Sequence, residues 1–146
     1  MGSSNEPVAV RRFAPADADA VLDLWRRVGL GLSRTDTPEA LAGKLDRDPD
    51  LFLVATENGG AIVGAVMGAF DGRRGWIYHL AVDPADQRRG IGRLLLSKLE
   101  ARLRAKGCAK VNLLIQPANR DVAGFYERLG YRADELIFME KWLDRG

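Results

Sequence analysis

The chain has 146 residues, of which 47% are hydrophobic and 29% are charged. This length and composition predict one globular domain over residues 1–146, with residues 1–7 frayed, and exclude disordered and fibrous proteins. One cysteine and one histidine exclude disulfide-stapled folds and zinc fingers, so no metal is expected. Neither a membrane-spanning run nor a secretory signal is present, and we therefore expect a cytoplasmic protein that does not contact a membrane.

Basic residues are concentrated in the middle of the chain. The formal net charge is only +2, but residues 73–110 carry 10 basic and 3 acidic groups. Such a block indicates an anion site, most simply for phosphate or nucleic acid. A solvated basic helix face is the plainer alternative.

The first 50 residues predict a strand and two helices. Val21, Trp25 and Val28 have the spacing of one helical face. Thr37 and Pro38 supply an N-cap and a proline at the first helical position. The expected elements are a strand over 8–13, a helix over 17–28 that stops at Gly29, a loop over 29–36, and a helix from Thr37 that ends before Pro49.

The remaining sequence predicts three hairpin-connected strands, a long helix, a further strand, a short helix and one or two terminal strands. Short turns at 58–60 and 71–73 join the three strands. The apolar run 111–115 is typical of a strand buried on both faces. The expected elements are strands over 51–57, 61–70 and 76–82, a helix from Ile91 to Gly107, a strand over 111–115, a short helix capped by Asn119 or Asp121 and closed by Gly130, and one or two strands over 131–142.

This order of elements predicts an α/β fold of the mixed α+β type. The strand, helix, strand unit at 76–115 requires one parallel pair, since its two strands are joined by a crossover helix. The other strands follow one another through short turns and are expected to be antiparallel. The sheet should therefore be largely antiparallel with one parallel pair, flanked by about four helices.

A glycine-rich turn leads from the third of these strands into the long helix, with the pattern Gln87-x-x-Gly90-x-Gly92. The first amides of a helix lack internal partners, and glycines allow a ligand to approach the main chain. A phosphate or diphosphate fits such a turn. The chain lacks the Gly-Lys-Ser/Thr of a P-loop, and Leu95 stands where a dinucleotide-binding turn needs its third glycine. The side chains expected to add positive charge there are Arg88, Arg89 and Arg93.

This turn resembles the acetyl-CoA pyrophosphate loop of the GNAT superfamily of N-acetyltransferases, small bacterial members included. Residues further along the chain resemble the family's conserved series on the last helix and the turn after it, and the resemblance covers about residues 8–143. It implies a GNAT-like acyl-CoA N-acyltransferase fold, in which the parallel strand pair is splayed. The matching downstream residues are Asn119, Phe125-Tyr126 and Leu129-Gly130-Tyr131.

The resemblance implies acetyl-CoA as cosubstrate and assigns residues to it. Main-chain groups of Leu80 and Val82 would hold the pantetheine arm like an extra strand, and an amide near Leu80 or Ala81 would bind the oxyanion. Tyr126 would stand near the thioester sulfur as general acid, because a phenol stays protonated at neutral pH; a core position beside Phe125 is the alternative. The implied cofactor-binding residues are Leu80, Ala81, Val82, Gln87, Arg88, Arg89, Gly90, Ile91, Gly92, Arg93, Asn119 and Tyr126.

The general base is less evident from the sequence. In the family branch that modifies ribosomal-protein N-termini, a glutamate serves as base, and Leu114 occupies the matching position here. Tyr78 and His79 are candidates for relaying a proton through water. Because neighbouring strand residues face opposite sides, at most one of them should face the acceptor site. Cys108 is dismissed as a nucleophile, since it lies away from the loop and has no triad partner.

The expected partners are acetyl-CoA and a primary amine, small molecule or protein, in a monomer or homodimer. Two alternatives remain: a CoA-binding module without efficient catalysis, and, more remotely, a nucleic-acid-binding protein that uses the basic block 73–110. The three tryptophans, Trp25, Trp76 and Trp142, fit the core better than the acceptor cleft. The candidate cleft residues are Trp25, Leu30, Leu32, Asp36 and those near Leu136.

Overall fold

The structure is a computed structural model that describes residues 7–57 and 60–144. The start of the chain, residues 1–6, and two residues of the expected 58–60 turn lie outside the described residues. The chain forms two compact units, which divide between Leu114 and Ile115 and are described separately below. The single domain over residues 1–146 stays a prediction.

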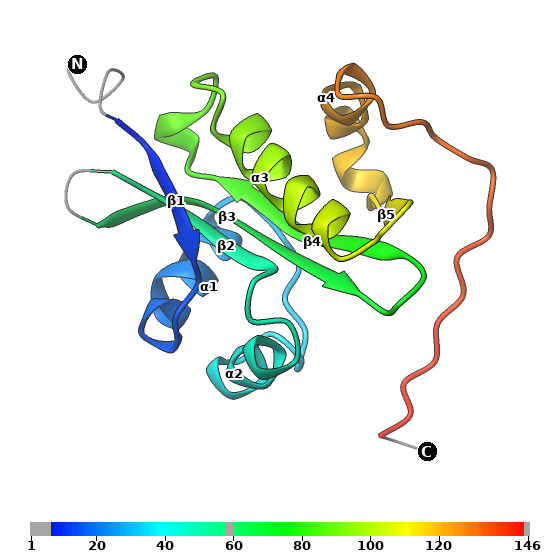
Figure 1. Cartoon of the computed structure of the whole chain (residues 1–146), viewed down its shortest axis with the longest axis horizontal. Helices are drawn as coiled ribbons and strands as arrows, with labels where there is room; N and C mark the ends of the chain where they lie inside the picture. Colours follow the sequence, from blue (N-terminus) through cyan, green and yellow to red (C-terminus); the bar gives the residue numbers. More distant parts are fainter. Residues whose placement is uncertain (1–6, 58–59, 145–146) are drawn as a thin grey trace. The chain divides into compact units, whose positions relative to one another are not determined.

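The first unit is a five-stranded sheet with helices on both faces (Figure 1). Strand order follows the sequence, and all neighbours are antiparallel except the parallel pair β4–β5. The predicted α/β class with a mixed, largely antiparallel sheet is confirmed. None of the helices in the described part of the chain is both long and apolar enough to cross a membrane. The elements are β1 (Ala9–Arg12), η2 (Pro15–Asp17), α1 (Ala18–Arg27), α2 (Pro38–Arg47), β2 (Phe52–Glu57), β3 (Ala61–Phe70), β4 (Gly75–Val82), η3 (Pro84–Asp86), α3 (Ile91–Ala105) and β5 (Val111–Leu113).

The helix ends follow the signals in the sequence. The Thr37 hydroxyl accepts a hydrogen bond from the amide of Ala40 at 3.1 Å, and Pro38 opens α2. The long helix α3 is followed by Gly107 in the left-handed region at φ 86°, where glycine is favoured because it has no Cβ. Local sequence therefore sets the boundaries of α2 and α3.

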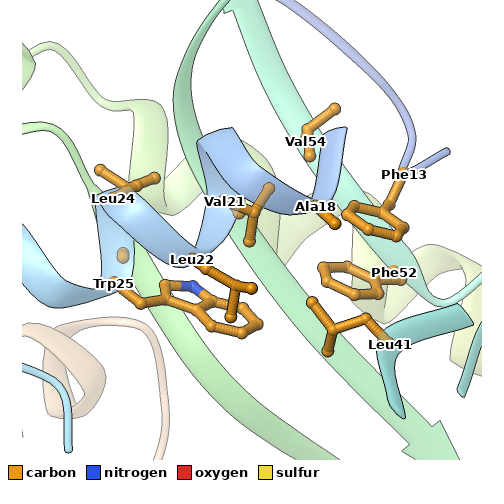
Figure 2. Packing of buried hydrophobic residues seen from close by; sticks show 11 residues of the cluster. Phe13, Ala18, Val21, Leu22, Leu24, Trp25, Leu41, Phe52 and Val54 are labelled. Carbon is orange, nitrogen blue, oxygen red and sulfur yellow. The ribbon is translucent and has the colours of Figure 1, made fainter. Parts of the chain in front are cut away.

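The aromatic core lies between α1, α2 and one face of the sheet. Figure 2 shows the rings of Phe13 and Phe52 face to face, with Trp25 and Leu41 beside them. The Phe13 and Phe52 centroids are 4.0 Å apart, and the Trp25 and Phe52 centroids 6.0 Å apart. Leu30 and Leu32 of the 29–36 loop are half-buried and pack against the same cluster. The predicted core position of Trp25 is thus confirmed.

The other face of the sheet is covered by α3, which approaches β3 closely because two glycines of that strand, Gly64 and Gly68, face it. A Cβ on Gly68 would lie 2.6 Å from Leu99 Cδ1, and one on Gly64 would lie 3.1 Å from Ile91 and Leu95. Side chains at these strand positions would collide with the buried leucine layer of α3. The glycines of β3 therefore set the helix-to-sheet distance.

A β-bulge interrupts β4 near its middle. Met67 pairs with Tyr78 and Ala65 pairs with Ala81, so that Val66 of β3 faces two residues of β4. One of these two, His79, has a left-handed backbone with φ 50°. A bulge bends its strand and shifts the alternation of side chains beyond it.

The strand β5 is shorter than expected. It pairs with β4 only from Gly75 to Ile77, and its residues are half-buried. The expectation of a strand over 111–115 buried on both faces is wrong, because β5 is an edge strand with one neighbour and Leu114 is 56% exposed. Within the described residues, no strand pairs with β4 on this side beyond Ile77, so the parallel pair is splayed.

The second unit contains η4 (Pro117–Val122) and α4 (Ala123–Arg128). Val122 is the N-cap of α4, so neither Asn119 nor Asp121 caps it, because the 3-10 turns opened by Pro117 already run through both residues. Gly130 ends the helix with φ 96°, as expected. The predicted strands over 131–142 are wrong: no described strand pairs with this segment, Leu136 is 83% exposed, and Trp142 is exposed rather than in the core.

Gly68→Ala tests the close approach of α3. We expect the free energy of unfolding to fall by about 1–3 kcal/mol, because the new methyl overlaps buried Leu99. Gly43→Ala in the exposed interior of α2, where a Cβ meets nothing within 4 Å, should instead stabilise the protein by about 0.5–1 kcal/mol. Urea unfolding of both variants measures this difference, and equal effects would contradict the close-packing account.

Candidate functional site

The first turn of α3 presents amides that have no partner inside the helix. Gly90 is the N-cap with φ 79°, and Arg88 before it is also left-handed at φ 69°. Leu94 is the first residue whose amide bonds inside the helix, donating to the Gly90 carbonyl at 3.0 Å. The amides of the three residues before it, 91–93, therefore lie ahead of the first intrahelical bond, at the positive end of the helix dipole. Such a cluster attracts an anion.

A buried ion cluster holds this turn from below. The Arg89 guanidinium lies 2.8 Å from Glu57 and 2.6 Å from Asp86, and its side chain is 12% exposed. The hydrogen bond to Glu57 raises the pKa of Arg89. The Arg89 guanidinium is therefore paired within the fold with two carboxylates, and the part of its charge in anion binding stays a prediction. Arg88 and Arg93 are exposed, as expected of groups that face a solvent-borne anion.

The chain between β4 and the turn is fixed by further polar contacts. Asp83 accepts a hydrogen bond from the Ala85 amide at 3.0 Å and pairs with Arg27 of α1 at 2.7 Å. Arg27 is the main cause that lowers the pKa of Asp83. The Gln87 side chain donates to the Val82 carbonyl at 3.2 Å. These contacts tie the turn to α1 and to the end of β4.

The splayed edge of β4 leads directly into this turn. Tyr78 to Val82 have β3 on one side and no described strand on the other. Residues 80–82 then continue through η3 to the amides before α3. An open strand edge and an anion-binding turn are thus continuous along the main chain, which suits an extended, amide-containing ligand that ends in a phosphate group.

A pocket of about 750 Å³ opens between α2, the loop before it and the β3–β4 hairpin. Both Tyr78 and His79 line it, so the prediction that at most one of them faces this side is wrong. The β4 bulge is the cause, because its extra residue interrupts the regular alternation by which neighbouring strand residues face opposite sides of the sheet. The lining residues are Thr35, Asp36, Ala40, Leu41, Lys44, Arg47, Asp48, Met67, Ala69, Phe70, Asp71, Trp76, Tyr78 and His79.

Of the first-unit residues expected in the cleft, Asp36 lines the pocket, whereas Trp25, Leu30 and Leu32 belong to the core cluster. The core expectation for Trp76 is also wrong, since it lines the pocket and stacks on Tyr78 with centroids 6.5 Å apart. Burial, with a smaller contribution from Asp71, raises the pKa of Tyr78. The Tyr78 phenol therefore keeps its proton at neutral pH.

One contact in this pocket was missed by sequence reasoning. His79 Nε2 lies 3.3 Å from Asp36 Oδ1, and the imidazole packs on the Trp25 ring with centroids 4.7 Å apart. Asp36 Oδ2 accepts a hydrogen bond from the Ser33 amide at 2.9 Å. The Ser33–Asp36 turn is visible in the sequence as a local motif, but its meeting with β4 depends on the packing of the loop.

The second unit holds Asn119 and Tyr126. Asn119 lies in the 3-10 segment η4, and its amide donates to the Gln116 carbonyl at 2.8 Å. Tyr126 is half-buried in edge-to-face contact with Phe125 and Tyr131, at 5.2 and 5.5 Å between centroids. Burial raises the pKa of Tyr126 to about 12. Tyr126 therefore makes aromatic contacts, as expected if it were a core residue, and its hydroxyl stays protonated at neutral pH.

Cys108 lies at the opposite end of β4 from the turn. Its thiol is within 3.3 Å of the Lys110 carbonyl, and its sulfur would be 2.9 Å from a Cβ on Gly75. Since β4 runs from Gly75 to Val82, its length separates Cys108 from the turn before α3 by roughly 20 Å, at about 3.3 Å per residue. This position agrees with the dismissal of Cys108 as a nucleophile.

Known proteins share both the sequence and the fold. A model of the "Acetyltransferase (GNAT) family" matches residues 18–131. Acetyltransferase ECA0875 of Pectobacterium atrosepticum is 44% identical over 134 residues, which are 92% of this chain and 94% of that protein.

Two solved structures share the fold at low identity. Ard1 from Thermoplasma volcanium has a TM-score of 0.79 at 22% identity, covering 88% of this chain and 84% of that one. The PaiA N-acetyltransferase from Thermoplasma acidophilum, in complex with coenzyme A, has a TM-score of 0.78 at 17% identity, covering 90% and 93%. The family match over most of the chain, together with the 44% identity to the Pectobacterium acetyltransferase, shows that the chain belongs to the GNAT family of acetyltransferases.

Proposed function

We propose that this acetyltransferase moves an acetyl group from acetyl-CoA directly to a primary amine within a ternary complex. The observation that carries the proposal is the continuous path formed by the open edge of β4 and the first amides of α3, which precede its first intrahelical bond. Coenzyme A has the matching parts in the same order, a pantetheine arm with two amides followed by a diphosphate. The family membership supports the same cosubstrate.

In this proposal the main chain binds most of the cosubstrate. Leu80 and Val82 hold the pantetheine arm along the strand edge, and an amide at Leu80 or Ala81 stabilises the oxyanion. The amides between Gln87 and Arg93, which include those of Arg88, Arg89, Gly90, Ile91 and Gly92, hold the diphosphate. Exposed Arg88 and Arg93 add charge around it, whereas Arg89 keeps the turn in shape. Asn119 provides a further contact.

Tyr126 serves as the general acid in this proposal. Attack of an amine on a thioester expels a thiolate, which must gain a proton. Because burial raises the pKa of Tyr126 to about 12, its hydroxyl is fully protonated at neutral pH and available as a donor. The Phe125 and Tyr131 rings hold it in place.

The incoming ammonium group must lose a proton before it can attack. Leu114 replaces the glutamate base of the ribosomal-protein branch, and it is an exposed residue beyond the end of β5. We assign the proton relay to the pocket that Tyr78 and His79 line. Three aspartates and two basic residues line the pocket, and Asp48 is paired with Lys44 at 2.6 Å. The remaining carboxylates of Asp36 and Asp71 suit a cationic acceptor.

Calorimetry with coenzyme A tests the cosubstrate site. We expect coenzyme A to bind, and pantetheine, which lacks the diphosphate, to bind at least about 100-fold more weakly, because two or more charge-assisted hydrogen bonds are lost.

Two glycines at opposite ends of α3 provide matched variants for this test. Gly90 and Gly107 are both left-handed, and neither has an atom within 4 Å of its Cβ position. Gly90→Ala and Gly107→Ala should each cost about 1–2 kcal/mol of stability, but only Gly90→Ala should weaken coenzyme A binding, by about 10-fold. Absence of coenzyme A binding to the wild-type protein would rule out the proposed function.

Tyr126→Phe should lower kcat by about 100-fold or more and leave the KM for acetyl-CoA nearly unchanged, because the proton donor is lost while the ring remains. Since its pKa is about 12, ionisation of this tyrosine should not lower the wild-type rate below a pH of about 10. Thiol release with a panel of amines gives both measurements.

Unchanged turnover in Tyr126→Phe would remove the acid role. Tight coenzyme A binding without thiol release from any amine would instead favour a binding module.

A further inference from the structure

Asp36 is a buried carboxylate whose two oxygens have different partners. Oδ2 accepts a hydrogen bond from the Ser33 amide at 2.9 Å and lies 3.4 Å from the Ser33 hydroxyl. Oδ1 lies 3.3 Å from His79 Nε2. The residue is only 8% exposed, and the turn fixes the direction of its side chain. One carboxylate thus connects the loop before α2 to the bulge of β4.

The imidazole of His79 is held on two sides and open on a third. Its backbone is left-handed, its ring rests on Trp25, and Nε2 faces Asp36. No described residue forms a hydrogen bond with Nδ1, and the ring lines the pocket beside Tyr78. A neutral imidazole carries one N–H and one lone pair, and a carboxylate oxygen 3.3 Å from Nε2 favours the N–H on that nitrogen. The lone pair then belongs to Nδ1.

We propose that Asp36 is a positioning residue that holds neutral His79 in the Nε2-protonated form, so that Nδ1 accepts the proton of the acceptor ammonium group. This inference rests on the proposed amine acetylation and names its base. It selects His79 over Tyr78, whose phenol is stacked on Trp76 and retains its proton at neutral pH. The carboxylate also stabilises the imidazolium that forms, as in acid–histidine pairs of hydrolases.

The protons and electron pairs balance. An ammonium proton passes to His79 Nδ1, and the freed nitrogen lone pair forms the C–N bond with the thioester carbonyl carbon. The C–S bond breaks, and its electron pair leaves on sulfur, which takes the Tyr126 hydroxyl proton. The second nitrogen proton restores the tyrosine, and His79 releases its proton to solvent through the pocket. The products are the amide, free thiol and one proton.

Asp36→Asn separates the positioning role from the structural one. The asparagine oxygen can still accept from the Ser33 amide, which preserves the turn. Its NH₂ group would then face His79 Nε2 and require a lone pair there, which moves the ring proton to Nδ1. We expect kcat to fall by about 100-fold, with little change in the KM for acetyl-CoA or in coenzyme A affinity.

His79 is the single histidine of the chain, so ¹⁵N NMR of the labelled full-length protein reports its ring without ambiguity. At a pH where the imidazole is neutral, the wild-type ring should carry its proton on Nε2 and the Asp36→Asn ring on Nδ1. The matched control is Asp17→Asn, since Asp17 accepts from the Ala14 amide in the same three-residue turn geometry but pairs with Arg11. This control should keep the wild-type spectrum and kcat.

Several results would overturn the inference. The inference is wrong if NMR of the wild-type protein shows the neutral His79 ring protonated on Nδ1. It is also wrong if the Asp36→Asn protein keeps the Nε2-protonated ring. A kcat of Asp36→Asn within about threefold of the wild-type value would contradict it as well. If coenzyme A binds but no amine yields thiol, the proposed function and the role of His79 as base fail together, whereas the NMR result still judges whether Asp36 sets the ring form. Failure to bind coenzyme A removes the proposed function and with it the role of His79 as base, and the NMR result then tests only whether Asp36 sets the ring form.

Discussion

The β-bulge in β4 is the constraint on which the candidate site depends. By placing two β4 residues opposite Val66, it gives His79 a left-handed backbone and lets the ring face the same pocket as Tyr78. The parallel pairing with β5 stops at Ile77, directly before the bulge. Since bulges bend their strand and increase its twist, one extra residue accounts for the shared pocket and accompanies the opening of the strand edge.

The same arrangement fixes where the main chain can meet a ligand. β4 enters the turn before α3 through three sets of contacts: Asp83 with Arg27, Gln87 with the Val82 carbonyl, and Arg89 with Glu57 and Asp86. A turn anchored in this way has its amides oriented before any ligand arrives. Preorganised donors lose less entropy on binding than mobile side chains do, so the main chain suits the recognition of a common cosubstrate.

Several side chains of the basic block 73–110 are paired with acceptors inside the folded chain. Arg89 is neutralised by Glu57 and Asp86, and Lys106 pairs with Asp50 at 3.2 Å. Arg102 donates to the Asp50 carbonyl. These acceptors come from outside the block or from its few acidic residues. The surplus of positive charge is therefore partly used within the fold, which weakens the inference of a nucleic-acid surface and leaves Arg88 and Arg93 beside the turn.

The sequence by itself determined the elements that depend on neighbours in the chain: the Thr37 cap, the Gly107 stop, the hairpin strands and the glycine-rich turn. It also carried the family resemblance that the comparisons confirm. Periodicity and capping are local, so they are readable without the fold. The strands expected over 131–142 failed because a strand exists only when another pairs with it. Tertiary structure alone decided the β4 bulge, the Arg89 ion cluster and the meeting of Asp36 with His79, since each depends on segments that the sequence keeps far apart.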